Sequence, residues 1–468
     1  MQINDLHQFM TLLESRGELV RIGVETDPIQ EIAAITDRVC KSPAGGGKAL
    51  LFERPRGACF PVATNLFGSL SRVCLALGVD HLDLLTERMS ALLEQIISPN
   101  LALLDKQIAA LPEFSRFSPN ISPDTDPQLI TMETPDLGVF PFLQSWPGDG
   151  GASGHPRYIT LPLVFTEDPH TGRPNCGMYG AQVRGATELA LRWKAGSGAA
   201  RHLESCRRLG RPMPVAIALG GTPAATFSAL FPLPGELDEM IFAGFLRGAA
   251  LDMFTCRSVA LRVPAGCELI IEGYVDPNET ALEGPFGNHT GCYSPATAAS
   301  LLRVTAISHR QAAVIPATVV GPPPMEDCWM AQAWERVLLA FLRRLVPEVR
   351  ELCFPLEWVF HQSAIISLEN PSAAMVRETA SLLWSTPWFA GSRLLIFVDR
   401  EVDPSDLAGV AWRAINLCDY GSDSFRDSTG TRLALDATGC RVAKQRIEPS
   451  ADVELRVAKR WKEYGLDE

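Results

Sequence analysis

The feature of this sequence that most constrains its fold is a middle section of short apolar runs of strand length. Between about residues 128 and 315 these runs include "RYITLPLVF", "MPVAIALGG", "CELIIEGYV" and "LLRVTAISH". The stretch "RYITLPLVFTEDPHTGRPNCGMYGAQVRG" reads as two strands around a turn, and one helix, "ELDEMIFAGFLRGAA", interrupts the series. Several short strands at regular spacing are typical of a β-barrel or a β-sandwich. The sequence therefore predicts a β-rich domain at the centre of the chain.

The sections on either side mix helices and strands. Near the start, "INDLHQFMTLLESRG" has a helical apolar stripe that we expect Asn4 and Asp5 to cap and Gly17 to end. A second amphipathic helix, "PIQEIAAITDRVCKS", precedes two short strands in "GGGKALLFE" and "FPVATNLFGS". After residue 315, helices and apolar strands alternate, which is typical of a covered and mostly parallel sheet.

These patterns predict an α/β multidomain protein with three domains. We expect an N-terminal α/β domain over residues 1–115, a β-rich domain over 116–315 and a C-terminal α/β domain over 316–468. The stretch "LPEFSRFSPNISPDTDP" at 111–127 is rich in Pro, Ser and Asp, so we interpret it as a linker. "GGTPAATF" reads as a glycine turn before a short segment.

Composition narrows the class of partner. The formal net charge is -12, and an acidic surface repels phosphate backbones, which argues against a nucleic-acid partner. The 12 cysteines are scattered without a C-x-x-C pair, as expected for reduced thiols in a cytoplasmic protein. The N-terminus lacks the apolar core of a signal peptide. With no run of about 18 apolar residues, we expect no membrane span.

The stretch "ALEGPFGNHTGCY" at 281–293 has the composition of a functional loop. Glu283 comes directly before a Gly-Pro turn, and three glycines, Gly284, Gly287 and Gly291, allow the backbone to approach another group closely. Asn288 follows five residues after the acid. The alternative is a plain hairpin turn whose glutamate faces water, and the composition alone does not decide between the two.

In many blocks, and in the same order along nearly the whole chain, the sequence resembles the UbiD family of decarboxylases. The blocks are "INDLHQFMTLLESRGELVRI", "KALLFERPRG", "PVATNLFGS", "YITLPLVFTEDPHTGRPNCGMY", "MPVAIALGG", "LDEMIFAGFLRG", "IIEGYV", "EGPFGNHTGCYS", "GPPPMEDC" and "LALDATG". The resemblance implies a (de)carboxylase of aromatic or unsaturated acids that uses prenylated FMN with manganese and potassium. It is greatest to the branch acting on hydroxybenzoates and hydroxynaphthoates in quinone biosynthesis.

The same resemblance implies a fold and an assembly. It predicts that the central domain is a split β-barrel of the flavin-reductase type. It also predicts a helix near the C-terminus that helps to form a homo-oligomer, a dimer or a hexamer.

The resemblance places cofactor and metal ligands on specific residues. Metal ligands are expected at Asn175 and Glu239, and the histidine that completes the set falls on Gly196. His202 matches a different histidine that some relatives carry in addition. A cation held by one amide and one carboxylate would be weakly bound. Further cofactor contacts are expected from Tyr179, Pro232 and Arg432.

The family's catalytic centre joins two acids through an arginine, and two of these three positions are substituted here. Glu283 matches the first acid, the arginine falls on Gly180, and the second acid falls on Asn288. Arg184 is not an obvious replacement, because residues 180 and 184 of one strand lie about 13 Å apart. An amide cannot transfer a proton near neutral pH. Without the arginine we expect Glu283 to lack a cationic partner, so that burial favours its protonated form.

These substitutions leave two classes of function open. One is an atypical carboxy-lyase that acts on a small aromatic acid with Glu283 as the proton donor. The other is a catalytically silent homologue that serves as a structural or regulatory subunit beside an active UbiD-type partner. A third, weaker reading is a pocket that binds ordinary FMN or another aromatic ligand.

Overall fold

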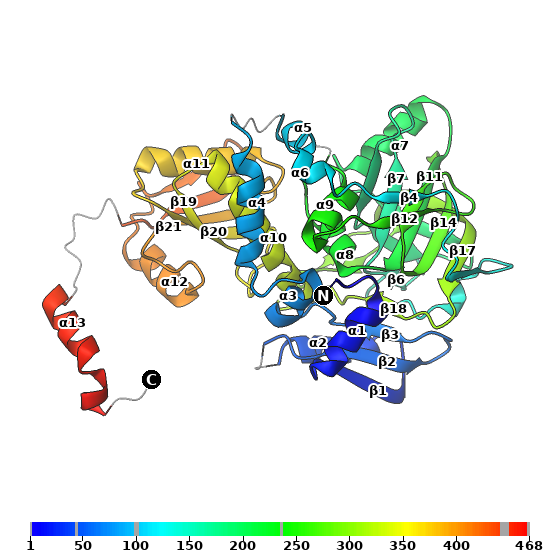
Figure 1. Cartoon of the computed structure of the whole chain (residues 1–468), viewed down its shortest axis with the longest axis horizontal. Coiled ribbons are helices and arrows are strands. Elements are labelled where there is room, and N and C mark those ends of the chain that lie inside the picture. The colour runs from blue at the N-terminus through cyan, green and yellow to red at the C-terminus, as the bar shows by residue number, and fades with distance from the viewer. Residues whose placement is uncertain (1, 43–44, 98–102, 235–236, 440–448, 466–468) are drawn as a thin grey trace.

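The structure is a computed structural model that describes residues 2–42, 45–97, 103–234, 237–439 and 449–465. The chain begins with a four-stranded sheet of order β1-β2-β3-β18, with helices packed beside it (Figure 1). Its elements are α1 (Leu6–Ser15), β1 (Leu19–Thr26), α2 (Glu31–Cys40), β2 (Ala49–Pro55), β3 (Val62–Thr64) and β18 (Ile315–Ala317). Because β18 pairs in parallel with β3, residues after the β-rich section complete the N-terminal sheet.

Helix α1 forms as the sequence predicts. The carboxylate of Asp5 accepts a hydrogen bond from the backbone N–H of Gln8 at 2.8 Å, which satisfies one of the free donors at the helix start. The apolar stripe, with Phe9 and Leu13 at its centre, is buried. Gly17 follows the helix with φ +67°, a conformation that glycine adopts without strain. The helices α3 (Leu70–Leu77), α4 (Asp83–Glu94), α5 (Leu104–Ala109) and α6 (Pro112–Ser115) come next.

The middle section folds into a curved sheet of nine strands, in agreement with the expected split barrel. Eight strands follow the order β6-β9-β10-β17-β14-β11-β7-β8, and β5 pairs with β17. All these pairings are antiparallel. The strands are β5 (Leu129–Thr131), β6 (Tyr158–Ile159), β7 (Leu163–Glu167), β8 (Pro174–Gly177), β9 (Gly180–Val183), β10 (Glu188–Arg192), β11 (Met213–Gly220), β14 (Cys267–Glu283) and β17 (Thr297–Arg310).

Three helices and a small second sheet accompany the curved sheet. The helices are α7 (Gly198–Arg208), α8 (Pro223–Leu230) and α9 (Glu239–Arg247). The small sheet has the order β13-β12-β4 and consists of β13 (Arg262–Pro264), β12 (Asp252–Thr255) and β4 (Asn120–Ser122). A two-stranded sheet pairs β15 (Phe286–Gly287) with β16 (Tyr293–Ser294). The interpretation of 111–127 as a linker is therefore wrong, because this stretch contains α6 and β4.

The C-terminal section forms a five-stranded sheet of order β19-β20-β21-β23-β22. Its central pairings are parallel and its edge pairings antiparallel, so the predicted parallel sheet is confirmed for the centre. The elements are α10 (Glu326–Leu345), β19 (Val349–Cys353), β20 (Ser363–Leu368), α11 (Ala373–Ser385), β21 (Leu394–Asp399), α12 (Leu407–Asn416), β22 (Ser424–Arg426), β23 (Leu433–Asp436), α13 (Ala451–Lys459) and a 3-10 turn, η3 (Trp461–Tyr464).

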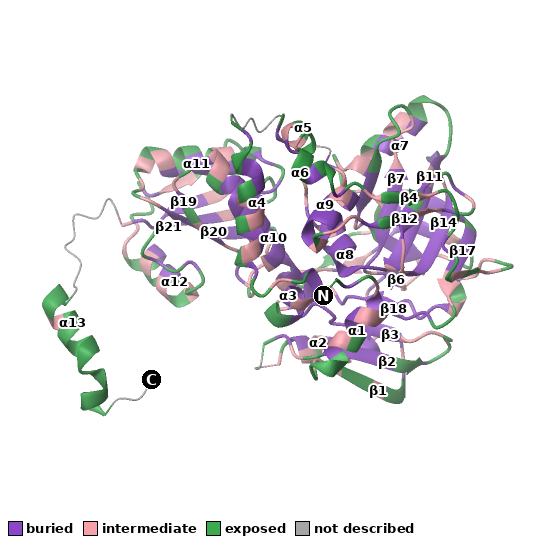
Figure 2. Cartoon of the chain, viewed as in Figure 1, coloured by how far each residue is buried: buried purple, intermediate pink, exposed green. Residues whose placement is uncertain are grey.

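One hydrophobic core joins the three sections. The largest cluster of buried side chains runs from Ile3 in the N-terminal section to Ala434 in the C-terminal sheet. Figure 2 shows the burial concentrated in α10, α8 and the sheets, whereas α13 is exposed along its length. Packing of this extent favours a fixed arrangement of the three sections relative to one another.

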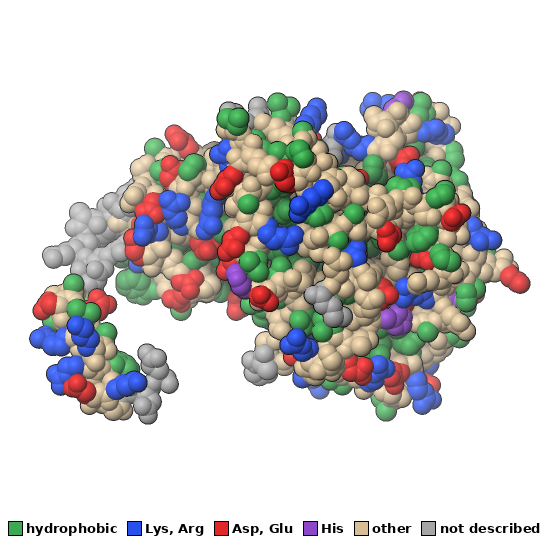
Figure 3. All heavy atoms as spheres, in the orientation of Figure 1, with side chains coloured by type: hydrophobic (Ala, Val, Ile, Leu, Met, Phe, Trp, Pro, Cys, Tyr) green, Lys and Arg blue, Asp and Glu red, His purple; other side chains and the backbone are tan. Residues whose placement is uncertain are grey.

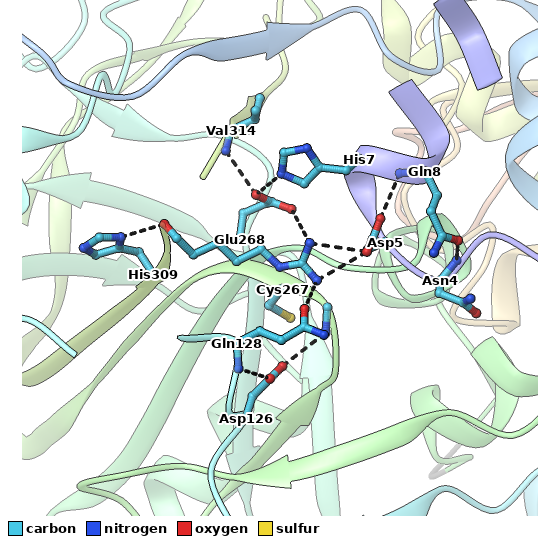
Figure 4. A network of polar contacts seen from close by, with 12 residues as sticks. Asn4, Asp5, His7, Gln8, Asp126, Gln128, Cys267, Glu268, His309 and Val314 are labelled. Atoms are coloured by element: carbon cyan, nitrogen blue, oxygen red, sulfur yellow. Dashed lines mark hydrogen bonds and ion pairs between the residues drawn. The ribbon is translucent and has the colours of Figure 1, made fainter. Parts of the chain in front are cut away.

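A polar network also ties α1 to the central sheet (Figure 4). The buried carboxylate of Glu268 on β14 contacts His7 Nε2 and accepts the Val314 N–H, both at 3.1 Å. Arg310 on β17 lies 3.7 Å from the same carboxylate and 3.3 Å from Asp5, the cap of α1. The interaction with Glu268 raises the pKa of His7 despite its partial burial. These contacts offset part of the cost of burying the Glu268 carboxyl group.

The surface carries charges of both signs. On the face in Figure 3, acidic and basic side chains are interspersed over all three sections. Among the described residues, every helix is either too short or too polar to cross a bilayer.

Candidate active site

A cavity of about 520 Å³ lies between the curved sheet and the C-terminal section. The sheet contributes residues of β6, β9 and β10 and the end of β14, and the opposite wall comes from the start of α10 and from residues 360–362. A volume of this size suits an aromatic ligand or cofactor ring. The cavity is lined by four residues of the expected catalytic centre and cofactor site: Tyr179, Gly180, Glu283 and Asn288.

Glu283 is buried in the wall of this cavity, with 2% of its surface exposed. It ends β14, and its carboxylate forms an ion pair with Arg192 at the end of β10. Burial raises the pKa of Glu283, while the charge of Arg192 and hydrogen bonds from Arg192 and Tyr158 act in the opposite direction. Burial also raises the pKa of Tyr158, which keeps that phenol protonated. The site thus holds a carboxyl group whose proton is retained more readily than in water.

The expectation that Glu283 lacks a cationic partner is wrong, and the strand register explains why. In the antiparallel pair of β9 and β10, Arg192 lies directly opposite Gly180. Opposite residues of such a pair project from the same face of the sheet, so a long side chain at 192 reaches the space that a side chain at 180 would reach. Gly180 leaves that space open, since a Cβ added there would meet no atom within 4 Å. Arg184 instead donates to the carbonyl of Leu282 at 2.6 Å.

The glycine-rich loop after Glu283 approaches protein groups closely. Gly284 has φ +97°, and a Cβ there would lie 3.3 Å from Arg192 Nη2. At Gly287 a Cβ would lie 2.3 Å from the ring of Trp146, so no larger residue fits. The side-chain oxygen of Asn288 accepts hydrogen bonds from the backbone N–H and the hydroxyl of Thr290, at 2.9 and 2.7 Å. Asn288 therefore stabilises the turn of the loop.

A histidine–aspartate pair that the sequence analysis missed faces the same cavity. His289 Nδ1 lies 2.8 Å from Asp327, in the first turn of α10. Burial lowers the pKa of His289, but the hydrogen bond and charge of Asp327 outweigh it and raise the pKa overall. The ring of His361 lies 5.3 Å away, and burial lowers its pKa to about 4. The loop "GNHTG" was a signal for His289, but nothing in the sequence pairs it with Asp327.

The expected metal ligands Asn175 and Glu239 lie near each other, on β8 and at the start of α9. The Glu239 carboxylate accepts the backbone N–H of Cys176, which neighbours Asn175, at 3.0 Å. Burial raises the pKa of Glu239 to about 8, partly offset by that hydrogen bond. Both residues line a smaller cavity of about 110 Å³.

The position expected for the third metal ligand, Gly196, carries no side chain that could coordinate a metal. Gly196 is exposed, has φ +76° and would bring an added Cβ within 4 Å of no atom. Gly198, the first residue of α7, packs against Asn175, whose side-chain oxygen would lie 1.9 Å from an added Cβ. His202 is buried and hydrogen-bonded to Thr166 at 3.0 Å, and burial lowers its pKa to about 4.

A divalent metal does not fit this donor set. Only two of the expected donors are present, the carboxyl group of Glu239 and the amide of Asn175. Within the described ranges no three His, Cys, Asp or Glu side chains gather closely enough to hold a metal. Manganese and potassium prefer several charged or carbonyl oxygens, more than these two residues supply.

Of the remaining expected cofactor contacts, one lines the large cavity and two lie outside its lining. Tyr179 lines the large cavity and stacks edge-on with Trp193, ring centroids 5.1 Å apart. The carbonyl of Pro232 accepts a hydrogen bond from Trp388 at 2.8 Å. Arg432 lies against Trp384 and 3.4 Å from Asp427 in the C-terminal section, and neither it nor Pro232 lines the large cavity.

Three family descriptions match consecutive parts of the chain. They are the N-terminal, Rift-related and C-terminal domains of 3-octaprenyl-4-hydroxybenzoate carboxy-lyase, over residues 10–92, 122–323 and 328–444. An uncharacterised protein of Archaeoglobus fulgidus is 38% identical over 424 residues, which are 90% of this chain and 86% of the relative. An uncharacterised protein of Synechocystis is 34% identical over 502 residues, 99% of this chain and 96% of the relative.

Solved structures share the fold over almost the entire length. Vanillic acid decarboxylase of Sedimentibacter hydroxybenzoicus in its closed form has a TM-score of 0.84 and 24% identity, with complete coverage of both chains. The UbiD-class enzyme HmfF of Pelotomaculum thermopropionicum, in complex with prFMN, has a TM-score of 0.79 and 24% identity, covering 97% of this chain and 99% of that one. The apo 3,4-dihydroxybenzoic acid decarboxylase of Klebsiella pneumoniae has a TM-score of 0.76 and 18% identity, covering 98% of this chain and 99% of that one. With matching sequence domains in the same order and a matching fold, the chain belongs to the UbiD family of decarboxylases.

Proposed function

We propose that this protein is a carboxy-lyase that removes CO2 from an aromatic acid of the hydroxybenzoate or hydroxynaphthoate type. The observation that carries the proposal is Glu283, a buried carboxyl with a raised pKa in the wall of a cavity large enough for an aromatic acid. Two of the similar structures are decarboxylases of vanillic acid and 3,4-dihydroxybenzoic acid, which supports this substrate class. HmfF, which is described with prFMN, supports a prenylated flavin as the cofactor.

The large cavity fits such a flavin better than the smaller corner fits a metal. Its walls present Leu161, Met178 and Tyr179 on one side and Met330 and Phe360 on the other, which together would hold a flat aromatic ring system. When bound, the prenylated flavin supplies an acceptor for the electrons of the broken bond.

The protein must supply a proton to the carbon that loses CO2. The bond between this carbon and the carboxylate breaks, CO2 leaves, and a proton forms the new C–H bond. Glu283 can donate that proton because burial favours its neutral form, and it regains a proton from water afterwards. Asn288 has no proton to exchange, so a single carboxyl group, that of Glu283, both donates the proton and is protonated again.

The test compares the wild-type protein with Glu283→Gln, both co-expressed with a flavin prenyltransferase. An absorption spectrum measures the retained flavin, and CO2 release from 4-hydroxybenzoate and a hydroxynaphthoate measures turnover. Glutamine keeps the shape of the side chain but cannot donate an acidic proton, so we expect turnover to fall about 100-fold or more with flavin retained. Glu188→Gln is the matched control, because Glu188 is on the same strand as Arg192 but pairs with Arg303 at the surface.

Two results would contradict the proposal. Equal turnover of Glu283→Gln and wild type would remove Glu283 from the proton transfer. A wild-type protein that retains no flavin and releases no CO2 would favour the silent subunit, and capture of an active UbiD-type partner would then support that role.

A further inference from the structure

Arg192 combines three features that a purely structural arginine does not need. Its side chain lines the large cavity, its guanidinium pairs with Glu283, and Nη2 also donates to the carbonyl of Pro295 at 3.2 Å. Its Nε is buried and has no hydrogen-bond partner in the part of the chain that the structure describes. That nitrogen is closed off from the cavity, but the Arg192 side chain as a whole is 32% exposed and lines the cavity, so it remains accessible to a ligand.

The space beside Arg192 is also open. Gly180 is opposite Arg192 in the strand pair, and no atom lies within 4 Å of the position that its Cβ would occupy. A guanidinium presents its N–H groups as a planar fork that matches the two oxygens of a carboxylate. In the described part of the chain Nη2 makes both contacts, to Glu283 and to Pro295, which leaves Nη1 as a donor for a second carboxylate in the cavity.

We propose that Arg192 binds the carboxylate of the substrate and holds it beside Glu283, in the space that Gly180 leaves open. This inference rests on the proposed function for the identity of the substrate, an aryl carboxylate. The arginine has two tasks: one nitrogen keeps Glu283 in place, and the free edge orients the group that leaves as CO2. Carboxylate and proton donor then meet at one side of the substrate ring.

The proposal is tested by binding, which does not require turnover. Isothermal titration calorimetry measures the affinity of the purified protein for benzoate, 4-hydroxybenzoate and 2-naphthoate, and for phenol as a probe without a carboxylate. We expect Arg192→Ala to lower the affinity for aryl carboxylates about 10-fold or more and to leave the affinity for phenol unchanged. The reason is that a charge-assisted contact is lost only for the acids. Arg192→Lys keeps the charge without the fork, so we expect an intermediate loss.

The matched control is Arg184→Ala, which removes a guanidinium near the same loop that donates to Leu282. This variant should bind the aryl carboxylates and phenol with the same affinities as the wild type. An exchange variant, Gly180→Arg with Arg192→Gly, moves the arginine to the opposite strand on the same face, and we expect it to restore carboxylate binding above that of Arg192→Gly alone. Circular dichroism checks that each variant is folded.

Each of three binding results would overturn the proposal. They are no binding of any aryl carboxylate to the wild type, equal affinities for wild type and Arg192→Ala whether or not turnover is lost, and a folded exchange variant that restores no binding. Carboxylate binding that depends on Arg192 without CO2 release would leave this inference in place and reject the proposed function. If affinities are equal and turnover is lost in Arg192→Ala, the role of Arg192 is to hold Glu283 in place and not to bind the substrate.

Discussion

At the scale of single residues, His289 is the group whose protonation the site controls most directly. Asp327 holds it at 2.8 Å, and the neighbouring rings of His361 and Phe360 enclose it. Lys194 is close enough to His361 to help lower the pKa of that ring, whereas His289 itself has a raised pKa. One imidazole with a raised pKa and one with a pKa lowered to about 4 therefore face the same cavity.

We predict that Asp327→Asn lowers the pKa of His289 below that of a free histidine. The substitution removes the charge and weakens the hydrogen bond that raise this pKa, while the burial that lowers it remains. The measurement is an NMR titration of the imidazole signals, assigned with His289→Gln. His202 is the internal control, since burial lowers its pKa to about 4 and Asp327 does not contribute to that pKa. An unchanged titration of His289 in Asp327→Asn would contradict the pairing.

Residues such as Arg192 mark the limit of what the sequence could predict. The sequence indicates Glu283 through its Gly-Pro loop, and two strands joined by a turn would place 180 opposite 192, so Arg192 could be found once that register is assumed. The contact between His289 and Asp327 could not be found this way. It joins a loop of the curved sheet to the first turn of α10, and only the packing of two sections brings them together.

At the scale of elements, local signals predicted helices well and long-range pairing poorly. The cap and apolar stripe of α1 are local, and both are confirmed. The strand β4 was missed because its partner is β12, about 130 residues later, and its polar composition resembles that of a loop. The stretch "GGTPAATF" contains the start of α8 rather than only a turn, and Pro223 at the first helical position was the signal for it.

The element that the fold explains least is α13. It has no buried residue, and Figure 1 shows it clear of the rest of the chain. Apolar side chains are exposed on it and on the turn that follows, among them Leu455 and Trp461, and α12 exposes Trp412 and Ile415. Exposed apolar side chains on an otherwise unpacked helix favour contact with another surface.

We predict that α13 joins copies of this chain and that Leu455→Asp lowers the molar mass in solution. A carboxylate in an apolar contact carries a desolvation cost that separates the copies. Light scattering after size exclusion measures the mass. Glu454→Ala changes the adjacent residue without adding a charge to the apolar side, so its mass should equal that of the wild type. Equal masses for all three proteins would exclude a role of Leu455 in assembly.

At the scale of the whole molecule, α10 links the sections and carries buried carboxyl groups. Glu326, its first residue, is 1% exposed and accepts the backbone N–H of Phe67 from the N-terminal section at 2.8 Å. Glu335, two and a half turns later, accepts the N–H of Phe354 in the C-terminal section. Burial raises the pKa of each to about 7, although these hydrogen bonds act in the opposite direction. One helix thus connects both outer sections through acids that stay protonated until near neutral pH.

These acids predict a loss of stability as the pH rises. A carboxyl whose pKa is raised by folding binds its proton more tightly in the folded state, so its contribution is complete below pH 4.5 and declines as the pH passes through 7. Glu326→Gln keeps an acceptor for Phe67 and cannot ionise. We therefore expect the wild type to lose more stability than the variant between pH 5 and 8.5, by a difference on the order of a few kcal/mol. Thermal unfolding followed across this range measures it, with the exposed Glu188→Gln as the control. Parallel curves for wild type and Glu326→Gln would show that this carboxyl titrates normally, and that the contact between the sections does not depend on its proton.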